Sequence, residues 1–143
     1  PLTTERPVDI QSWKKRRLTP KWGGNDTEPE PCVIVYHPPS VGWMARWREL
    51  AIQAPTLNAK EFTERSGDAD FSQQVSEWTD QVQVFRSELI SDLVVAVENL
   101  TMGGKAIDLS EAVAFVMDNE GLREEIFKAI LADGTLTDPE GKD

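Results

Sequence analysis

The chain contains a single cysteine, Cys32, and a single histidine, His37. One cysteine cannot form a disulfide within the chain, which favours a reducing compartment. A structural zinc site needs four ligands, so these two residues cannot complete one by themselves. A serine–histidine–aspartate triad also lacks good candidates, because His37 is the only imidazole. We therefore expect no metal, no other cofactor and no enzyme activity.

Long hydrophobic runs are also absent, since no stretch of eighteen apolar residues occurs. A membrane-spanning helix needs about twenty such residues, so we expect no contact with the membrane interior. The basic run at 14–17 leads into Thr-Pro and a polar turn, and not into the apolar segment of a signal peptide. The sequence therefore predicts neither secretion nor membrane insertion.

The net charge of −10 is distributed unevenly. Residues 1–48 carry 8 basic and 5 acidic side chains, a net charge of +3, whereas residues 49–143 carry 7 basic and 20 acidic ones, a net charge of −13. An acidic body repels phosphates, so we expect no nucleic-acid partner. One basic cluster is a candidate electrostatic contact, either with this protein's own acidic surface or with a second copy: Lys14, Lys15, Arg16 and Arg17.

The strongest periodic signal is an apolar stripe in the second half of the chain. Its members follow one another at steps of 4 and 3, as on one face of an α-helix: Phe71, Val75, Trp78, Val82, Phe85 and Leu89. No proline or glycine interrupts Ala69 to Met102, so we expect one helix of about thirty residues, roughly 45 Å long. Gly103 and Gly104 then form a turn. The stripe favours packing within one chain over a coiled-coil dimer, because it is short and contains aromatic residues.

The N-terminal third predicts a β-hairpin. Residues 32–37 are β-branched and aromatic and form the best strand of the chain. Residues 14–22 predict a second, edge strand, because Pro20 excludes a central position. Between them, residues 23–31 are rich in glycine, proline, asparagine and aspartate and predict a loop.

Further helices are expected on both sides of the long one. Residues 41–54 have an amphipathic pattern that begins after Ser40, a good N-cap. Short helices are expected over 59–65 and 109–117, the second with Asp108 and Glu111 as a capping pair. Asp68 is expected to cap the long helix. A last helix begins at Asn119 and is expected to end at Gly134, which suits a C-terminal cap.

These elements predict a mainly α protein with a small N-terminal β-hairpin, an α+β fold whose helices pack around one long central helix. Its 143 residues suit one domain. We expect a flexible arm over 1–12, the domain over 13–134 and a flexible tail over 135–143.

The helix over 41–54 contains the candidate partner-binding residues: Trp43, Met44, Trp47, Arg48 and Ala51. Tryptophan and methionine are enriched at protein interfaces. The alternative is that Trp43 and Trp47 pack in the core against the long helix, which we favour. Met44 and its neighbours would then remain accessible and frame a groove together with the long helix.

The order of elements resembles the tail assembly chaperones of long-tailed, siphovirus-like bacteriophages. The resemblance covers residues 12–143 and rests on the two strands, the tryptophan-rich helix and two later segments: WKKRRLTPKW, PCVIVYHPPS, VENLTMGGKAIDLSEAV and EEIFKAILADG. It implies a protein that binds the tape measure protein and keeps it soluble in the host cytoplasm, associates with itself, and is absent from the mature virion. The tail tube protein is a further partner that it suggests.

Two other functions agree with the same composition. One is a permanent neck or tail component of the virion. The other is a small acidic adaptor or inhibitor that binds a host protein. Neither requires a catalytic centre, so the residues alone do not separate them from a chaperone.

Overall fold

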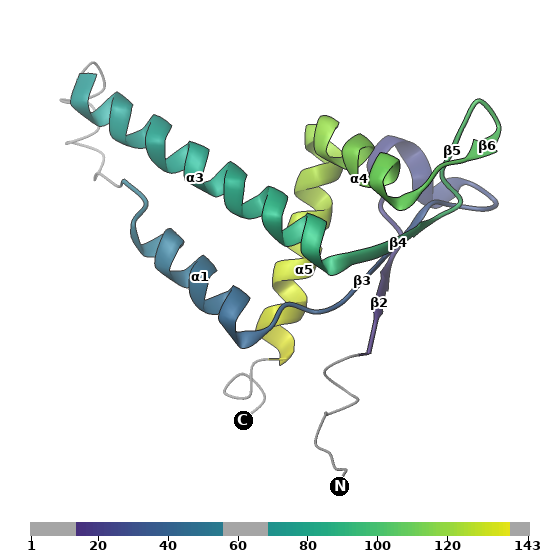
Figure 1. Ribbon diagram of the computed structural model, residues 1–143, viewed down its shortest axis with the longest axis horizontal. Helices are drawn as coiled ribbons and strands as arrows, with labels where there is room; N and C mark the ends of the chain where they lie inside the picture. Colours follow the sequence, from purple (N-terminus) through teal and green to yellow (C-terminus); the bar gives the residue numbers. More distant parts are fainter. Residues whose placement is uncertain (1–13, 56–68, 138–143) are drawn as a thin grey trace, which may run out of the picture.

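The computed structural model describes residues 14–55 and 69–137, and the side chains up to Gly134. The predicted N-terminal arm, the predicted helix over 59–65, the Asp68 cap and residues 138–143 lie outside the described residues. Figure 1 shows a body of strands and helices from which two helices, α1 and α3, extend to one side.

The predicted hairpin is confirmed. Strand β2 (Arg16–Leu18) pairs antiparallel with β3 (Val33–Tyr36), and the loop between them contains a short 3₁₀ stretch, η2 (Trp22–Thr27). Gly23 and Gly24 both have positive φ, a conformation that glycine adopts without a Cβ clash. The side chain of Asn25 closes the loop, because its amide donates to the carbonyls of Pro20 and Cys32.

The long helix ends earlier than predicted. Helix α3 covers Ala69–Leu93, and the next residue begins strand β4 (Val94–Glu98). The prediction of one helix as far as Met102 is therefore wrong. Val94, Val95 and Val97 are β-branched and fit a pleated strand well, and β3 offers them an open edge for pairing. The resulting sheet has the order β2-β3-β4 and is antiparallel throughout.

The predicted fold class is confirmed: helices dominate, one of them is long, and the β-structure is small. After β4, a two-stranded hairpin of β5 (Thr101–Met102) and β6 (Lys105–Ala106) turns through Gly103 and Gly104. Both glycines have positive φ, as a tight hairpin turn requires.

The predicted caps agree with the structure. Helix α1 (Val41–Ile52) begins after Ser40, whose hydroxyl accepts a hydrogen bond from the Trp43 amide. Helix α4 (Leu109–Asp118) begins with a full capping box of Asp108 and Glu111. Helix boundaries were thus well predicted where a side chain satisfies the first free amides.

The last helix, α5 (Glu120–Thr137), continues through Gly134, so the predicted cap at that residue is wrong. A Cβ at this position would clash with the side chains of Met44 and Pro39. The glycine therefore serves close packing between α5 and the start of α1, and not helix termination.

The core lies where the C-terminal half of α3, α5 and one face of the sheet meet. Phe85 is at its centre and contacts Trp43, Trp47 and Phe127, with ring centroids 5.6, 5.5 and 6.2 Å away. The most deeply buried side chains come from all three elements: Ile34, Leu89, Ile90, Ile126 and Ile130. Each such side chain contributes about 1.5–3 kcal/mol on burial.

Candidate functional site

The tryptophans of helix α1 pack against the core of the protein. Trp43 and Trp47 are half-buried and pack against the core rings, so the packing interpretation is confirmed. The expectation that Met44 remains accessible is wrong, because it is only 8% exposed and lies against Gly134. Arg48 and Ala51 are exposed, and neither lines the two cavities described below.

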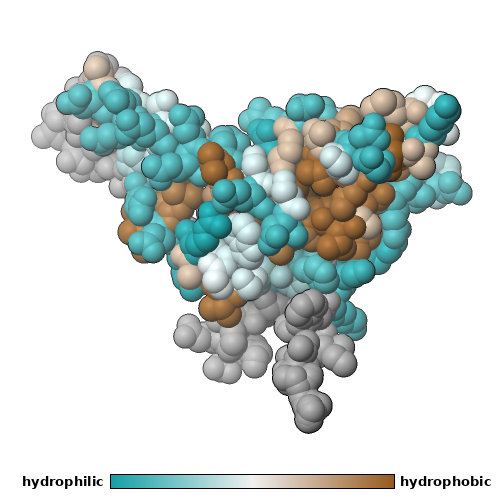
Figure 2. Space-filling view, viewed as in Figure 1, coloured by the Kyte–Doolittle hydropathy of each residue, from teal (hydrophilic) through white to brown (hydrophobic). Residues whose placement is uncertain are grey.

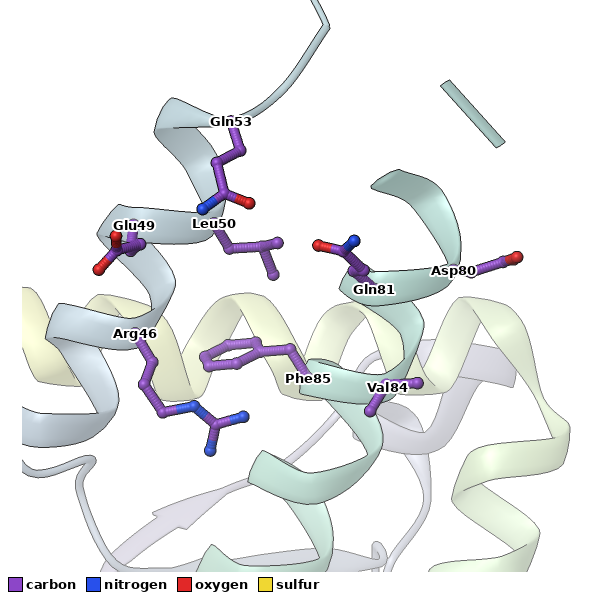
Figure 3. Close-up of a pocket in the computed structure, with 8 residues that line it drawn as sticks. All are labelled: Arg46, Glu49, Leu50, Gln53, Asp80, Gln81, Val84 and Phe85. Carbon is purple, nitrogen blue, oxygen red and sulfur yellow. The ribbon is translucent and has the colours of Figure 1, made fainter. Parts of the chain in front are cut away.

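A groove of about 480 Å³ lies between α1 and α3. Its lining residues come from these two helices and from Gln53, the C-cap of α1: Arg46, Glu49, Leu50, Gln53, Asp80, Gln81, Val84 and Phe85. Figure 3 shows Leu50 and Phe85 pointing into the groove from opposite walls, with Gln53 above Leu50 and Gln81 above Phe85. In Figure 2, hydrophobic atoms are visible in the hollow between the two helices.

The groove has an apolar floor. Phe85 lines the groove, is only 3% exposed and stacks on the ring of Trp47. Val84, one residue earlier on α3, is 56% exposed although it is aliphatic. Leu50 is half-buried on the opposite wall. An apolar side chain that entered between the helices would therefore contact carbon atoms on both sides.

Two contacts mark the ends of the groove. At one end, the indole N–H of Trp78 donates to the carbonyl of Leu50 over 2.8 Å. At the other, Arg46 forms an ion pair with Glu88 at 2.7 Å, and its guanidinium lies 5.4 Å from the centre of the Phe85 ring. Trp78 and Glu88 are ten residues apart on α3, so the groove is about 15 Å long.

These lining residues are hard to identify from the sequence alone. Phe85 belongs to the predicted apolar stripe and Leu50 to the amphipathic pattern over 41–54, but both patterns indicate burial and not access. The one available signal was Val84, an aliphatic residue on the otherwise polar face of α3 beside Asp80 and Gln81. An isolated valine of this kind is too common on protein surfaces to identify a site.

A smaller apolar cavity of about 210 Å³ lies on the far side of the body, beside Trp22, Cys32 and Phe115. The backbone amides of Lys21 and Trp22 donate to the carboxylate of Glu125, which fixes the loop over this cavity. Burial raises the pKa of the Cys32 thiol, so it is less reactive than a free thiol at neutral pH.

The basic cluster divides into two parts. Arg17 forms two hydrogen bonds with the carboxylate of Glu98, at 2.6 and 3.0 Å, and Arg16 lies 3.9 Å from Asp133. These two residues thus pair with acidic side chains of the same chain, which was one of the two contacts expected for the basic cluster. Lys14 and Lys15 are exposed.

Asp133 also accepts a hydrogen bond from the buried hydroxyl of Tyr36. Burial, together with this bond, raises the pKa of Tyr36 above its ordinary value. Asp133 therefore ties α5 to strands β2 and β3, which is a structural role.

Within residues 14–55 and 69–137, no group of three or more histidine, cysteine, aspartate or glutamate side chains is placed to hold a metal ion. No helix in these ranges is sufficiently long and apolar to cross a membrane. Figure 2 shows another hydrophobic area over α4. The smaller cavity also lies between helices, with Phe115 of α4 and Leu122 of α5 in its lining, but the α1–α3 groove has the greater volume of the two, about 480 Å³ against about 210 Å³.

Comparisons with known proteins do not identify the chain. No protein-family model matches it, and the searches of curated proteins and of solved structures likewise find no match.

Proposed function

We propose that this protein is a tail assembly chaperone of long-tailed bacteriophages, and that it holds helical segments of the tape measure protein in the α1–α3 groove. The observation that carries the proposal is the groove, in which Leu50, Val84 and Phe85 form apolar walls between two helices. Such a slot receives the apolar ridge of an amphipathic helix. The resemblance in the order of elements is the second support.

The dimensions of the groove suit a weak and reversible contact. A length of about 15 Å corresponds to roughly three turns of a bound helix. Small interfaces are typical of transient complexes. A chaperone needs this property, because it has to leave before the tail tube closes around the tape measure protein.

The proposal includes the location and the other partners of the family. The protein acts in the host cytoplasm, associates with itself, and contacts the tail tube protein when tail tube subunits replace it on the tape measure protein.

Mass spectrometry of purified phage particles should then detect none of its peptides. Stoichiometric amounts in the particle would favour a permanent neck or tail component, and capture by a host protein alone would favour an adaptor.

Replacing Val84 by glutamate tests the groove directly. Val84 is 56% exposed, so the variant should fold, but it places a charge inside the apolar slot. We expect the variant to bind the client roughly tenfold more weakly, which corresponds to about 1.4 kcal/mol. Less tape measure protein should then remain in the soluble fraction on co-expression. Soluble yield, measured by quantitative immunoblot, is the readout.

Leu109→Glu is the matched control, because Leu109 is 41% exposed and lies on α4, outside the groove. This variant should keep the tape measure protein soluble as well as the wild type does. Equal losses with both variants, or no loss with either, would contradict binding in the groove.

A further inference from the structure

The exposed surface of α3 is strongly acidic. The helix carries five carboxylates and one basic residue, Arg86. Arg86 pairs with Glu124 of α5 at 3.1 Å and lies over the ring of Phe127, so its charge is directed to the body and not to the groove. The carboxylates of α3 are Asp70, Glu77, Asp80, Glu88 and Asp92.

The single cation that lines the groove is already paired. Arg46 is bound by Glu88 and lies 4.8 Å from the centre of the Trp43 ring. By contrast, Glu49 on α1 and Asp80 on α3 have no ion-pair partner among the described residues. The lining of the groove therefore has a net negative charge.

The side chains are arranged in three zones across the groove. Figure 3 shows Leu50 and Phe85 in the middle, and Glu49 and Asp80 pointing outward on the α1 and α3 sides. A helix that placed its apolar ridge on Leu50 and Phe85 would thus have one carboxylate along each flank. Positive side chains on both flanks would satisfy these carboxylates, and negative ones would be repelled.

From this arrangement we infer that the groove selects a basic amphipathic helix, with lysine or arginine on both sides of an apolar ridge. The inference rests on the proposed function and specifies the chemistry of the client. Each exposed pair contributes only about 0.2–1 kcal/mol, so the apolar ridge gives most of the affinity and the flanking charges give the selectivity.

Two synthetic helical peptides test the inference with the purified full-length protein. Both carry the same leucine ridge, but one has lysine and the other glutamate at the flanking positions. Fluorescence anisotropy of the labelled peptides should show the lysine peptide binding roughly tenfold more tightly at low salt. The difference should shrink severalfold in 0.5 M NaCl, because exposed charges are then screened. Equal binding, or a preference for the glutamate peptide, would overturn the inference.

The double variant Glu49→Lys with Asp80→Lys should reverse the preference. The matched control is Asp26→Lys with Asp118→Lys, which makes the same change in net charge at exposed positions of η2 and α4. The control should keep the preference for lysine. If the control reverses it as strongly as the groove variant does, the selectivity comes from overall charge, and the inference fails.

The outcomes also separate the inference from the proposed function. If the lysine peptide binds in the groove but Val84→Glu leaves the tape measure protein soluble, the groove is basic-selective and the chaperone proposal fails. If Val84→Glu abolishes solubilisation but the two peptides bind equally, the chaperone proposal stands and the charge selectivity is refuted.

Discussion

At the scale of single residues, the pair formed by Arg17 and Glu98 is the clearest example of charge used for structure. The two residues lie on β2 and β4, on either side of β3. Arg17 faces Val35 and Glu98 faces Val33, so all four side chains lie on the same side of the sheet. The ion pair therefore spans β3 over two valines that are only 9% and 6% exposed.

This pair predicts a specific pH dependence. The hydrogen bond from Arg17 holds the pKa of Glu98 below its ordinary value of 4.5. A carboxylate with a lowered pKa in the folded state stabilises the protein above that ordinary value, and the contribution is lost as the pH falls through the lowered pKa. The free energy of unfolding of the wild type should therefore decrease from pH 4.5 downward more steeply than that of Glu98→Gln, as measured by urea titration.

The informative quantity is the difference in the free energy of unfolding between the wild type and Glu98→Gln. Glu77→Gln is a suitable control, because Glu77 is exposed on α3 and far from the sheet. The control should follow the wild-type curve. A Glu98→Gln curve that runs parallel to the wild type at every pH would show that the pair contributes nothing.

At the scale of elements, the contact between α1 and α5 depends on one missing side chain. Gly134 lets α5 approach Met44 and Pro39 more closely than any other residue would allow. Gly134→Ala should destabilise the protein by about 1–3 kcal/mol, the usual range for overpacking a filled core. Chemical denaturation followed by circular dichroism measures the change.

Gly42→Ala provides the comparison within a helix. A Cβ at Gly42 would meet only the Ser40 hydroxyl, at an ordinary 3.7 Å. Since alanine favours helix by up to about 1 kcal/mol over glycine, this variant should be neutral or more stable. If Gly134→Ala also stabilises the protein, α5 can move away from Met44 and Pro39 at no cost in the free energy of unfolding, and the interpretation of close packing is wrong.

Much of the secondary structure could be predicted, because the propensities of neighbouring residues and the helix-capping side chains determine it. The strand over 32–37 follows from β-branched residues, and the helix starts follow from Ser40 and from Asp108 with Glu111. The switch from α3 to β4 was harder to predict. The β-branched valines within 94–97 fit a strand, but Val97 and Leu100 also continue the apolar spacing of the helix, and pairing with β3 decides between the two.

The groove was predictable in outline but not in its residues. Both helices were expected, and so was a space between them. Which face of each helix stays open depends on how far the helices separate, and this is set by Trp47, Phe85 and Phe127 in three dimensions. Met44 was expected on the open side for this reason, although α5 covers it.

At the scale of the whole molecule, the helix pair α1 and α3 projects from the body, as Figure 1 shows. Burial along α3 is accordingly uneven. In its first half, residues 69–81, only Phe71 is buried, whereas the second half contributes five buried side chains: Val82, Phe85, Leu89, Ile90 and Leu93. The two halves of one helix thus have different local stability.

Hydrogen–deuterium exchange should reveal this difference. We expect amides in 69–81 to exchange at least roughly tenfold faster than those in 82–93, because less apolar burial opposes local opening. Addition of a bound client helix should slow exchange around residues 80–85 and leave α4 unchanged. Equal protection from exchange along the whole of α3 in the free protein would contradict a difference in local stability between its two halves.

The junction of Leu93 and Val94, where a helix becomes a strand without a loop, has a consequence for length variation. Because no loop separates the two elements, the directions in which the side chains of α3 point are fixed relative to the two faces of β4. A single inserted residue would rotate the whole helix by about 100° relative to the sheet, or else exchange the inner and outer faces of the strand. Insertions and deletions should therefore be excluded from this point of the chain.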